Sequence, residues 1–290
     1  MKLTRSSLAL AVLAAPLLGA QVHADEESTQ PPDNAKAGTF SVLTYNIWHD
    51  QRDWPLRRDF MVSEIKAMNP DVIVLQEVIQ REHLENQART LAEMLGYEYF
   101  FSTVDPPERA QRYGNAILTR HTVLETDMRK LEPLDDYRTA AYMRIEVDGK
   151  PVDIYNTHLH HTRQGGGVRA MQIRDMLDFV EATREGTNRV ILAGDFNANP
   201  DWDELELVLE DYVDTFAMFV DDPLAERHAT LNYHEPIGHS MRRIDYVFVH
   251  RKGMEELKPV RSEIVLNEPG PGGIWASDHF GVITWFEKRF

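Results

Sequence analysis

Residues 192–200 read LAGDFNANP, and this stretch decides how the chain is interpreted. The apolar run Val-Ile-Leu-Ala at residues 190–193 is typical of a buried strand. The run stops at a glycine, and Asp195 and Asn197 follow at once. Asn199-Pro200 then has the pattern of a helix N-cap with proline at the first helical position. The stretch predicts a strand that delivers polar side chains to its end; the alternative is a loop with Asp and Asn as turn residues.

Polar residues also stand at the ends of other apolar, strand-like runs. Burying such groups without partners costs free energy, and strand ends at one edge of a sheet converge. We therefore expect these side chains to share one cleft. Carboxylates and an amide form a set of hard oxygen ligands that suits Mg²⁺, Mn²⁺ or Ca²⁺, and histidines add acid–base chemistry near neutral pH. The residues are Asn46 in residues 40–47, Glu77 after 72–75, His158 after 152–157, Asp195 and Asn197, Asp245 in 244–249, and Asp278 and His279 before 280–286.

Each of these residues also has a purely structural interpretation. Asn46 could bond a loop backbone, Glu77 could pair with an arginine, and His158 could be a hydrogen-bonded histidine without a catalytic role. Asp278 and His279 could form an Asx-type turn. The full set is harder to explain by turns alone, so the shared cleft is the working hypothesis.

The rest of the chain alternates between helical and strand-like segments in two rough halves. Asp148-Gly149 between two strand-like runs predicts a hairpin. Residues 160–167, with three consecutive glycines, are predicted to be a loop. We find no short repeat and no linker, so the prediction is one compact domain with β-sheets covered by helices. The predicted helices are residues 57–68, 84–95, 169–183 and 202–209, and the further strands are 97–102, 115–119, 123–128 and 139–147.

The first residues have the parts of a secretory signal peptide. Lys2 and Arg5 give a positive start, residues 8–18 are apolar but short for a membrane span, and Ala24 ends an A-x-A-like cleavage site. An uncleaved membrane anchor is the alternative. The predicted organisation is a signal peptide at residues 1–24, a flexible tail at 25–37 and one domain at 38–290, in an exported protein that is periplasmic or secreted.

The chain is acidic and lacks cysteine. With 31 basic and 47 acidic residues among 290, its formal net charge is −16; it would be −18 without residues 1–24, which hold two basic residues and no acidic one. Such a surface repels nucleic acid and anionic membranes at long range, so a polyanionic substrate needs bridging cations or a local basic patch. The absence of cysteine excludes disulfides, thiolate zinc sites and cysteine nucleophiles.

Taken together and in order, seven short motifs resemble those of the endonuclease/exonuclease/phosphatase superfamily, in an exported bacterial-type member. The resemblance covers about residues 39–287. It implies a DNase I-like fold of the α/β (α+β) class, a four-layer α/β/β/α sandwich, and hydrolysis of phosphate esters with a divalent metal. The motifs are TYN at 44–46, LQEV at 75–78, GNAIL at 114–118, NTHL at 156–159, GDFN at 194–197, IDY at 244–246 and SDH at 277–279.

The resemblance also implies a role for each matching residue. Glu77 would be the main metal carboxylate, with Asn46 and Asp278 close to the ion, which would be Mg²⁺ or else Mn²⁺ or Ca²⁺. The remaining roles concern the attacking water and the phosphate. His279 would be the general base with Asp245 orienting its ring, Asp195 would orient or help deprotonate the water, Asn197 would hydrogen-bond the phosphate, and His158 would stabilise the transition state or protonate the leaving oxygen.

The substrate stays open at this stage. Arg138 could clamp a phosphate or form a surface salt bridge, and His160 and His161 could be solvated loop residues or substrate contacts. Tyr113-Gly114-Asn115 lacks the acidic residue that supports the first histidine in pancreatic-type DNases. We expect a metal-dependent phosphodiesterase or phosphatase acting on nucleic acid or small phosphate esters, monomeric and without a stable membrane span. The alternatives are a sphingomyelinase-type enzyme acting on lipid headgroups and a non-catalytic binding module.

Overall fold

The computed structural model describes residues 38–232 and 241–290, all within one compact unit of the chain. The predicted signal peptide at 1–24 and the predicted tail at 25–37 lie outside the described residues. Within the described ranges, no helix is both long enough and apolar enough to cross a membrane.

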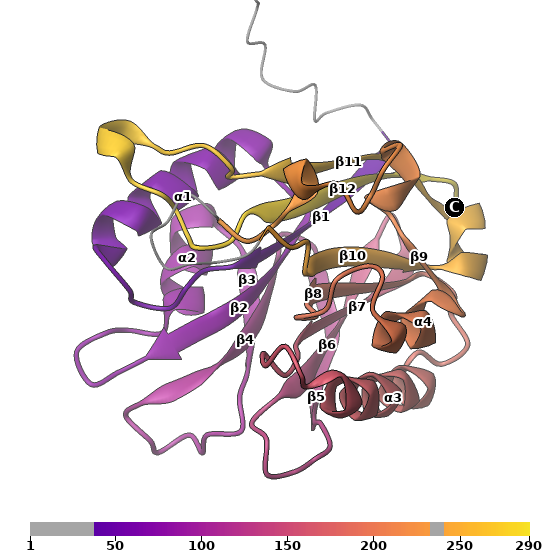
Figure 1. Ribbon diagram of the computed structural model, residues 1–290, viewed down its shortest axis with the longest axis horizontal. Coiled ribbons are helices and arrows are strands. Elements are labelled where there is room, and N and C mark those ends of the chain that lie inside the picture. The colour runs from indigo at the N-terminus through magenta and orange to yellow at the C-terminus, as the bar shows by residue number, and fades with distance from the viewer. Residues whose placement is uncertain (1–37, 233–240) are drawn as a thin grey trace, which may run out of the picture. The chain divides into compact units, whose positions relative to one another are not determined.

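Two six-stranded mixed sheets form the centre of this unit (Figure 1). The first has the order β11-β12-β1-β2-β4-β3, from β1 (Thr39–Asn46), β2 (Val72–Gln80), β3 (Glu98–Ser102), β4 (Arg112–Thr119), β11 (Leu257–Val265) and β12 (Gly281–Lys288). The second has the order β5-β6-β7-β8-β10-β9, from β5 (Thr122–Lys130), β6 (Thr139–Val147), β7 (Lys150–His158), β8 (Val190–Asp195), β9 (Tyr212–Asp214) and β10 (Asp245–His250). Each sheet holds one central parallel pair, β1 with β2 and β7 with β8.

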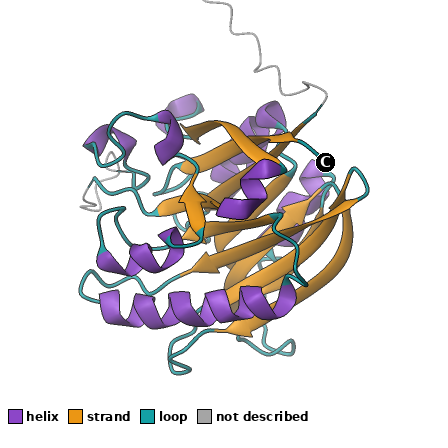
Figure 2. Cartoon of the chain, turned by 90° about the vertical axis from the view of Figure 1, so that its right-hand side faces the viewer, coloured by secondary structure: helices purple, strands orange, loops and turns teal. Residues whose placement is uncertain are grey.

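Helices cover the outer face of each sheet, as the views in Figures 1 and 2 show. On the first sheet, α1 (Trp54–Met68) and α2 (Gln87–Leu95) pack against residues such as Leu43 and Ile73. On the second, α3 (Gly166–Thr183) and α4 (Asp203–Leu209) pack against Tyr155 and Leu192. A third apolar cluster fills the space between the two sheets. The predicted four-layer α/β/β/α sandwich is therefore confirmed.

The layer between the sheets changes character along the strands. Side chains two residues apart on a strand point to the same face. The inward positions of β7 run from Val152 and Ile154, in the inter-sheet cluster, to His158 at the end of the strand. On β8 the same alternation runs from Ile191 to Asp195. The apolar core thus becomes a polar site at one edge of both sheets, because these strands end there.

Most predicted elements are present, with shifted ends. The hairpin at Asp148-Gly149 forms, with positive φ at both residues, and Gly96 ends α2 in the left-handed conformation as expected of a C-cap. The helix predicted at 57–68 begins earlier, at Trp54, because the Asp53 side chain caps it and Pro55 occupies its first turn.

One local prediction is wrong, one loop ends two residues early, and two strands were not predicted. Asn199-Pro200 does not begin a helix: the Asn199 carbonyl accepts the backbone N–H of Trp202, so the pair forms a turn, and α4 begins at Asp203. The loop predicted at 160–167 ends sooner, because Gly166 is already in α3. The short strand β9 and the long strand β11 were not predicted.

Candidate active site

The predicted site residues come together at the edge where the inter-sheet layer turns polar. A cleft of about 320 Å³ opens there. Asn46 and Asp245 lie fully buried beneath it, at the end of β1 and the start of β10. The cleft is lined by six of the eight predicted residues, namely Glu77, His158, Asp195, Asn197, Asp278 and His279.

A bulge in β2 presents Glu77 to the cleft. The pairing of β2 with β4 is regular up to Leu75 and resumes, shifted, at Val78. Glu77 has a φ of 58°, which is unusual for a residue other than glycine. In an unbroken strand Glu77 would face the same side as Leu75, which packs under the helices of the outer layer. The bulge redirects the carboxylate, a use of such irregularities common beside active sites.

The GDFN turn brings Asp195 and Asn197 close together. Gly194 has a φ of 148°, and a Cβ there would lie 2.1 Å from the carbonyl oxygen of Thr157, so only glycine allows β8 to approach β7 this closely. Asp195 Oδ1 accepts the backbone N–H of Asn197 at 2.9 Å, and the Asn197 side chain donates to the Leu159 carbonyl at 3.1 Å. Both side chains are therefore fixed before any ligand binds.

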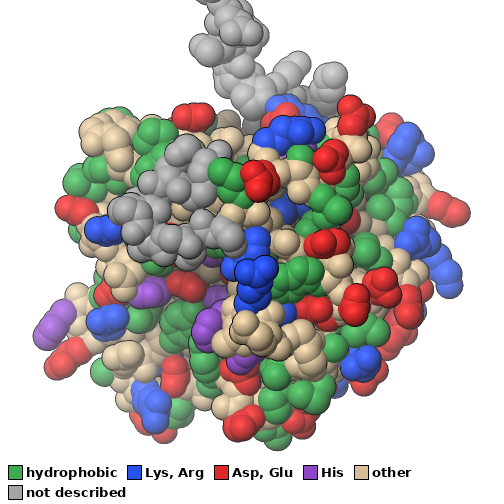
Figure 3. All heavy atoms as spheres, viewed as in Figure 1, with side chains coloured by type: hydrophobic (Ala, Val, Ile, Leu, Met, Phe, Trp, Pro, Cys, Tyr) green, Lys and Arg blue, Asp and Glu red, His purple; other side chains and the backbone are tan. Residues whose placement is uncertain are grey.

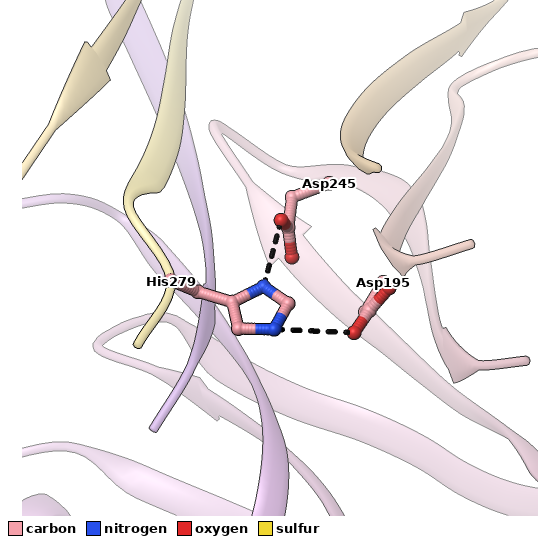
Figure 4. Close-up of side chains that lie close together, drawn as sticks. All are labelled: Asp195, Asp245 and His279. Carbon is pink, nitrogen blue, oxygen red and sulfur yellow. Dashed lines mark hydrogen bonds and ion pairs between the residues drawn. The ribbon is translucent and has the colours of Figure 1, made fainter. Parts of the chain in front are cut away.

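His279 is held between two carboxylates (Figure 4). Its Nδ1 lies 2.9 Å from Asp245 Oδ2, and its Nε2 lies 3.8 Å from Asp195 Oδ2. Burial alone disfavours the imidazolium, but the neighbouring carboxylates outweigh burial and raise the pKa of His279 well above its ordinary value. A histidine oriented through Nδ1 and facing the cleft with Nε2 has the arrangement of a general base whose protonated form is stabilised.

Asp195, on β8 of the second sheet, hydrogen-bonds to Asn46 on β1 of the first sheet and so connects the two sheets at this site. Its Oδ2 accepts from Asn46 Nδ2 at 3.1 Å and lies 3.3 Å from His158 Nε2. Burial, with the charge of Asp245, raises the pKa of Asp195 to about 7.

His158 differs from His279 in the groups that surround its ring and in the direction in which they shift its pKa. Burial, with Arg138 and His279 nearby, holds the pKa of His158 well below its ordinary value. Within the described part of the chain, no hydrogen-bond partner meets its Nδ1. This agrees with the absence of an acidic residue from the segment around Tyr113. Burial thus keeps His158 neutral, whereas the carboxylates beside His279 make it the stronger base of the two.

Two groups of side chains could hold a cation. Asp195, Asp245 and His279 offer ligand atoms within 4.8 Å of one another. His279, however, already uses Nδ1 on Asp245, and its Nε2 faces Asp195 at 3.8 Å, so both ring nitrogens are directed at carboxylates. At the Glu77 side of the cleft, burial and then the nearby charge of Asp278 raise the pKa of Glu77. Two acidic oxygens that repel each other without a cation fit a hard divalent ion better, and we favour that side.

Arg138 is not the surface salt bridge that was one interpretation of the sequence. Its side chain is only 3% exposed and lines the cleft beside His158. Tyr113, Tyr137 and His161 complete this side of the cleft. In the face shown in Figure 3, most visible histidine side chains gather near the middle, close to basic and acidic ones.

Sequence reasoning missed three contributors. His49 Nε2 lies 3.8 Å from Glu77 Oε2, on a loop where Trp48 and His49 both have positive φ. Arg57 is buried under that loop and donates to five backbone carbonyls, including those of Ile47 and Ala276. Ser277 Oγ donates to the Asn46 carbonyl and accepts the backbone N–H of His279. Only Ser277, inside the SDH motif, had a local signal.

The fold and the site define a two-sheet α/β/β/α protein with a buried cluster of carboxylates, amides and histidines at one edge. The chain belongs to the Endonuclease/Exonuclease/phosphatase family, whose model matches residues 43–279. This membership confirms the predicted superfamily.

Curated relatives match part of the chain. A putative neutral sphingomyelinase of Drosophila melanogaster is 27% identical over 179 residues, 55% of this chain and 39% of that protein. The 5′-tyrosyl-DNA phosphodiesterase of Caenorhabditis elegans is 27% identical over 172 residues, 57% of this chain and 44% of that protein. The aligned regions thus span less than half the length of either relative.

Solved structures match more of the chain, at lower identity. The human nocturnin catalytic domain with bound sulfate superposes with a TM-score of 0.69 at 20% identity, covering 90% of this chain and all of that one. D. rerio TDP2 complexed with a single-strand DNA product gives 0.69 at 20% identity, covering 86% of this chain and 98% of that one. At these identities the likeness establishes the fold.

Proposed function

We propose that this protein is a divalent-metal-dependent phosphoesterase that hydrolyses its substrate by in-line attack of water. One observation carries the proposal. His279, oriented by Asp245, faces Asp195 and shares a cleft with the carboxylates of Glu77 and Asp278. A base, an oriented water site and a hard-oxygen cation site within one cleft are what phosphate-ester hydrolysis needs.

The chain's own residues account for the deprotonation of the attacking water. His279 accepts a proton from water at Nε2, and Asp245 stabilises the resulting imidazolium. Asp195, with Asn46 and Asn197 holding its two oxygens, orients that water. The remaining steps need donors toward the phosphate.

Neutral His158 and the amide of Asn197 would supply those donors, His158 facing the charge that develops on the phosphoryl oxygens or the leaving oxygen. Glu77 and Asp278, with Asn46 and His49 beside them, would hold the cation. When bound, the cation would neutralise phosphoryl charge as a Lewis acid. Mg²⁺ is our first choice, since hard oxygen donors predominate, with Mn²⁺ or Ca²⁺ as alternatives.

We also propose export, to the periplasm or the medium, on the signal-like residues 1–24, and a monomer as the acting species. Two substrate classes are supported by relatives. The likeness to a protein named tyrosyl-DNA phosphodiesterase supports nucleic-acid or nucleotide esters. The likeness to one named neutral sphingomyelinase supports a lipid phosphodiester as the second candidate.

The test is hydrolysis of three substrates by the purified protein: bis(p-nitrophenyl) phosphate, plasmid DNA and sphingomyelin micelles, each with Mg²⁺ and with EDTA. We expect turnover of at least one that EDTA abolishes and Mg²⁺ restores. Glu77→Gln should lose that turnover, while Glu98→Gln, an exposed acid on β3, serves as the matched control. Hydrolysis of none, or hydrolysis indifferent to EDTA, would favour a non-catalytic binding module or a different mechanism.

A further inference from the structure

Arg138 has more hydrogen-bonding capacity than the described residues use. Its guanidinium is buried, yet Nε and Nη1 meet no hydrogen-bond partner in the described ranges. Asp136 Oδ1 lies 3.9 Å from Nε, beyond hydrogen-bond length. A buried cationic group with unmade hydrogen bonds is costly, and Arg138 lines an open cleft. The two nitrogens therefore point to an anionic oxygen brought by a ligand.

His161 adds a second donor at the same place. Its Nδ1 lies 3.4 Å from Arg138 Nη2. A guanidinium only donates, so His161 Nδ1 accepts and its proton sits on Nε2. Burial, then the charge of Arg138, lowers the pKa of His161, which keeps the ring neutral. His161 can then offer Nε2–H to a ligand in the cleft.

The loop that carries His161 is anchored from behind. His160 Nδ1 lies 2.8 Å from Asp136 Oδ2, and Gln172 on α3 accepts the backbone N–H of His160 at 2.8 Å. Gln172 also donates to Asp136 at 3.0 Å. Asp136 thereby ties the chain before β6 to the chain after β7, so the Arg138–His161 pair is preorganised.

An aromatic surface adjoins this pair. Arg138 lies over the ring of Tyr137, 4.6 Å from its centroid, and Tyr137 packs edge-on against Tyr113 at 5.8 Å. Tyr137 is 48% exposed and also lines the cleft. A planar ring of a ligand could stack here while an attached anionic group met Arg138.

Arg138 and His161 line the same cleft as the reacting centre, on the side of His158, but their polar contacts are with a different set of residues. The polar contacts of Arg138 within the described chain go to Asp136 and His161, whereas Asn46, Asp245 and His279 gather around Asp195. In the proposed mechanism, His158, Asn197 and the cation site would meet the scissile phosphate. In a chain of net charge −16, Arg138 supplies local positive charge that another anion would need, in a cleft that Arg242 also lines.

We propose that Arg138 and His161 form a subsite for a second anionic group, so that the preferred substrates are phosphate esters carrying another phosphate beside the scissile one. This inference rests on the proposed phosphoesterase function. It separates a phosphorylated, nucleotide-like substrate from a phosphocholine ester, whose headgroup has a cationic end and no second phosphate.

The test compares cleavage of the internal phosphodiester of three dinucleotides, TpT, pTpT and TpTp, with Mg²⁺ and chromatographic detection. We expect kcat/KM for one phosphorylated form to exceed that for TpT by about tenfold or more, mainly through KM, as expected of charge-assisted hydrogen bonds. Equal kcat/KM values for all three, or faster hydrolysis of sphingomyelin than of any dinucleotide, would overturn the subsite. Hydrolysis of no ester at all would instead reject the proposed function.

Variants show which residue causes the preference for the phosphorylated dinucleotide. Arg138→Gln should bring the ratio of kcat/KM for the preferred phosphorylated dinucleotide to kcat/KM for TpT close to one. Arg138→Lys should restore part of this ratio, since lysine keeps the charge but lacks the planar set of donors of arginine. His161→Gln should reduce the ratio less. Arg174→Gln removes an exposed positive charge on α3 and is the matched control. Equal losses on all substrates in Arg138→Gln would place Arg138 on the scissile phosphate and contradict the proposal.

Discussion

The two ends of the inter-sheet layer are built on the same strands, but one end is an apolar core and the other is a polar site. Toward one end, the inward positions hold Val42, Ile154 and Ile191, packed in one apolar cluster. Four residues further along each strand, the inward positions hold Asn46, His158 and Asp195. At about 3.3 Å per residue, some 13 Å separate a dry core from a reactive site. The core end holds the backbone fixed, and the polar end is therefore preorganised.

Between the two ends lies a polar layer that joins the sheets. Asn156 on β7 donates to the carbonyls of Leu75 and Ala116 in the first sheet, at 2.9 and 2.8 Å. Its Oδ1 accepts from Gln76 at 2.8 Å. Gln76 directly precedes Glu77, so this layer also supports the bulge. Between the apolar core and the polar site, the two sheets are thus joined by buried hydrogen bonds.

The largest effect should come from the polar end. His279→Ala removes the base, and we expect kcat/KM to fall about 10²–10⁴-fold, the usual contribution of general-base catalysis. The folded state should persist, because the removed ring belongs to the cleft and not to the apolar clusters. Steady-state kinetics with a urea unfolding curve on the same preparation tests both. Wild-type turnover in this variant would remove His279 from the mechanism.

The next effect should come from the apolar end and be of the opposite kind. Ile191→Ala leaves a cavity between the sheets and should lower the free energy of unfolding by about 2–5 kcal/mol. The kcat of the protein that remains folded should stay near wild type. Leu124→Ala, at a side chain 49% exposed on β5, is the control and should change stability little. If Ile191→Ala lost activity but not stability, the division between the two ends would be wrong.

The layer between the ends should respond in both measurements. Asn156→Ala leaves two carbonyls and one amide without their partner, and we expect about 1–3 kcal/mol less stability. Activity should fall as well, because Gln76 loses the bond that steadies the bulge at Glu77. Asn267→Ala, at an exposed residue, is the matched control. Urea unfolding and kcat/KM, measured on the same preparation, test whether Asn156→Ala lowers both stability and activity. A change in stability alone would mean that the bulge does not depend on this layer.

At the polar end, the sequence predicted the positions of some site residues better than those of others. Asn46, Asp195 and His158 follow apolar runs, so their place at strand ends was readable from alternation. The bulge at Glu77 was not, because it depends on the pairing of β2 with β4, which local pattern does not encode.

Burial of Arg138 was also hidden. It arises where the chain before β6 meets the loop after β7, two segments some twenty residues apart. β11 escaped prediction because its alternation is interrupted by a register shift near Pro259. Contacts between distant segments, rather than propensity, decided each of these features.

The smallest effect concerns two acidic residues at opposite ends of the same strand. Asp71, just before β2, accepts from Ser41 and faces Arg120 and His121 at 2.7 and 2.9 Å. Although burial opposes it, hydrogen bonds from His121 and Arg120 lower the pKa of Asp71 below its ordinary value of 3.8, whereas the pKa of Glu77 is raised. Asp71 therefore stabilises the fold above its unfolded pKa, and this stabilisation is lost as pH falls through its lower folded pKa.

Asp71→Asn tests the core end of that contrast. The variant should be less stable than wild type at pH 7, and the difference should shrink as the pH falls below 4, because wild-type Asp71 then takes up its proton. Urea unfolding at a series of pH values measures the difference, with Asp178→Asn, an exposed acid on α3, as control. Glu77→Gln should behave in the opposite sense at pH 7 and leave stability equal or higher, since it removes a charge that burial and Asp278 disfavour. A loss of stability in Glu77→Gln that matched the loss in Asp71→Asn would mean that both carboxylates serve the fold alike.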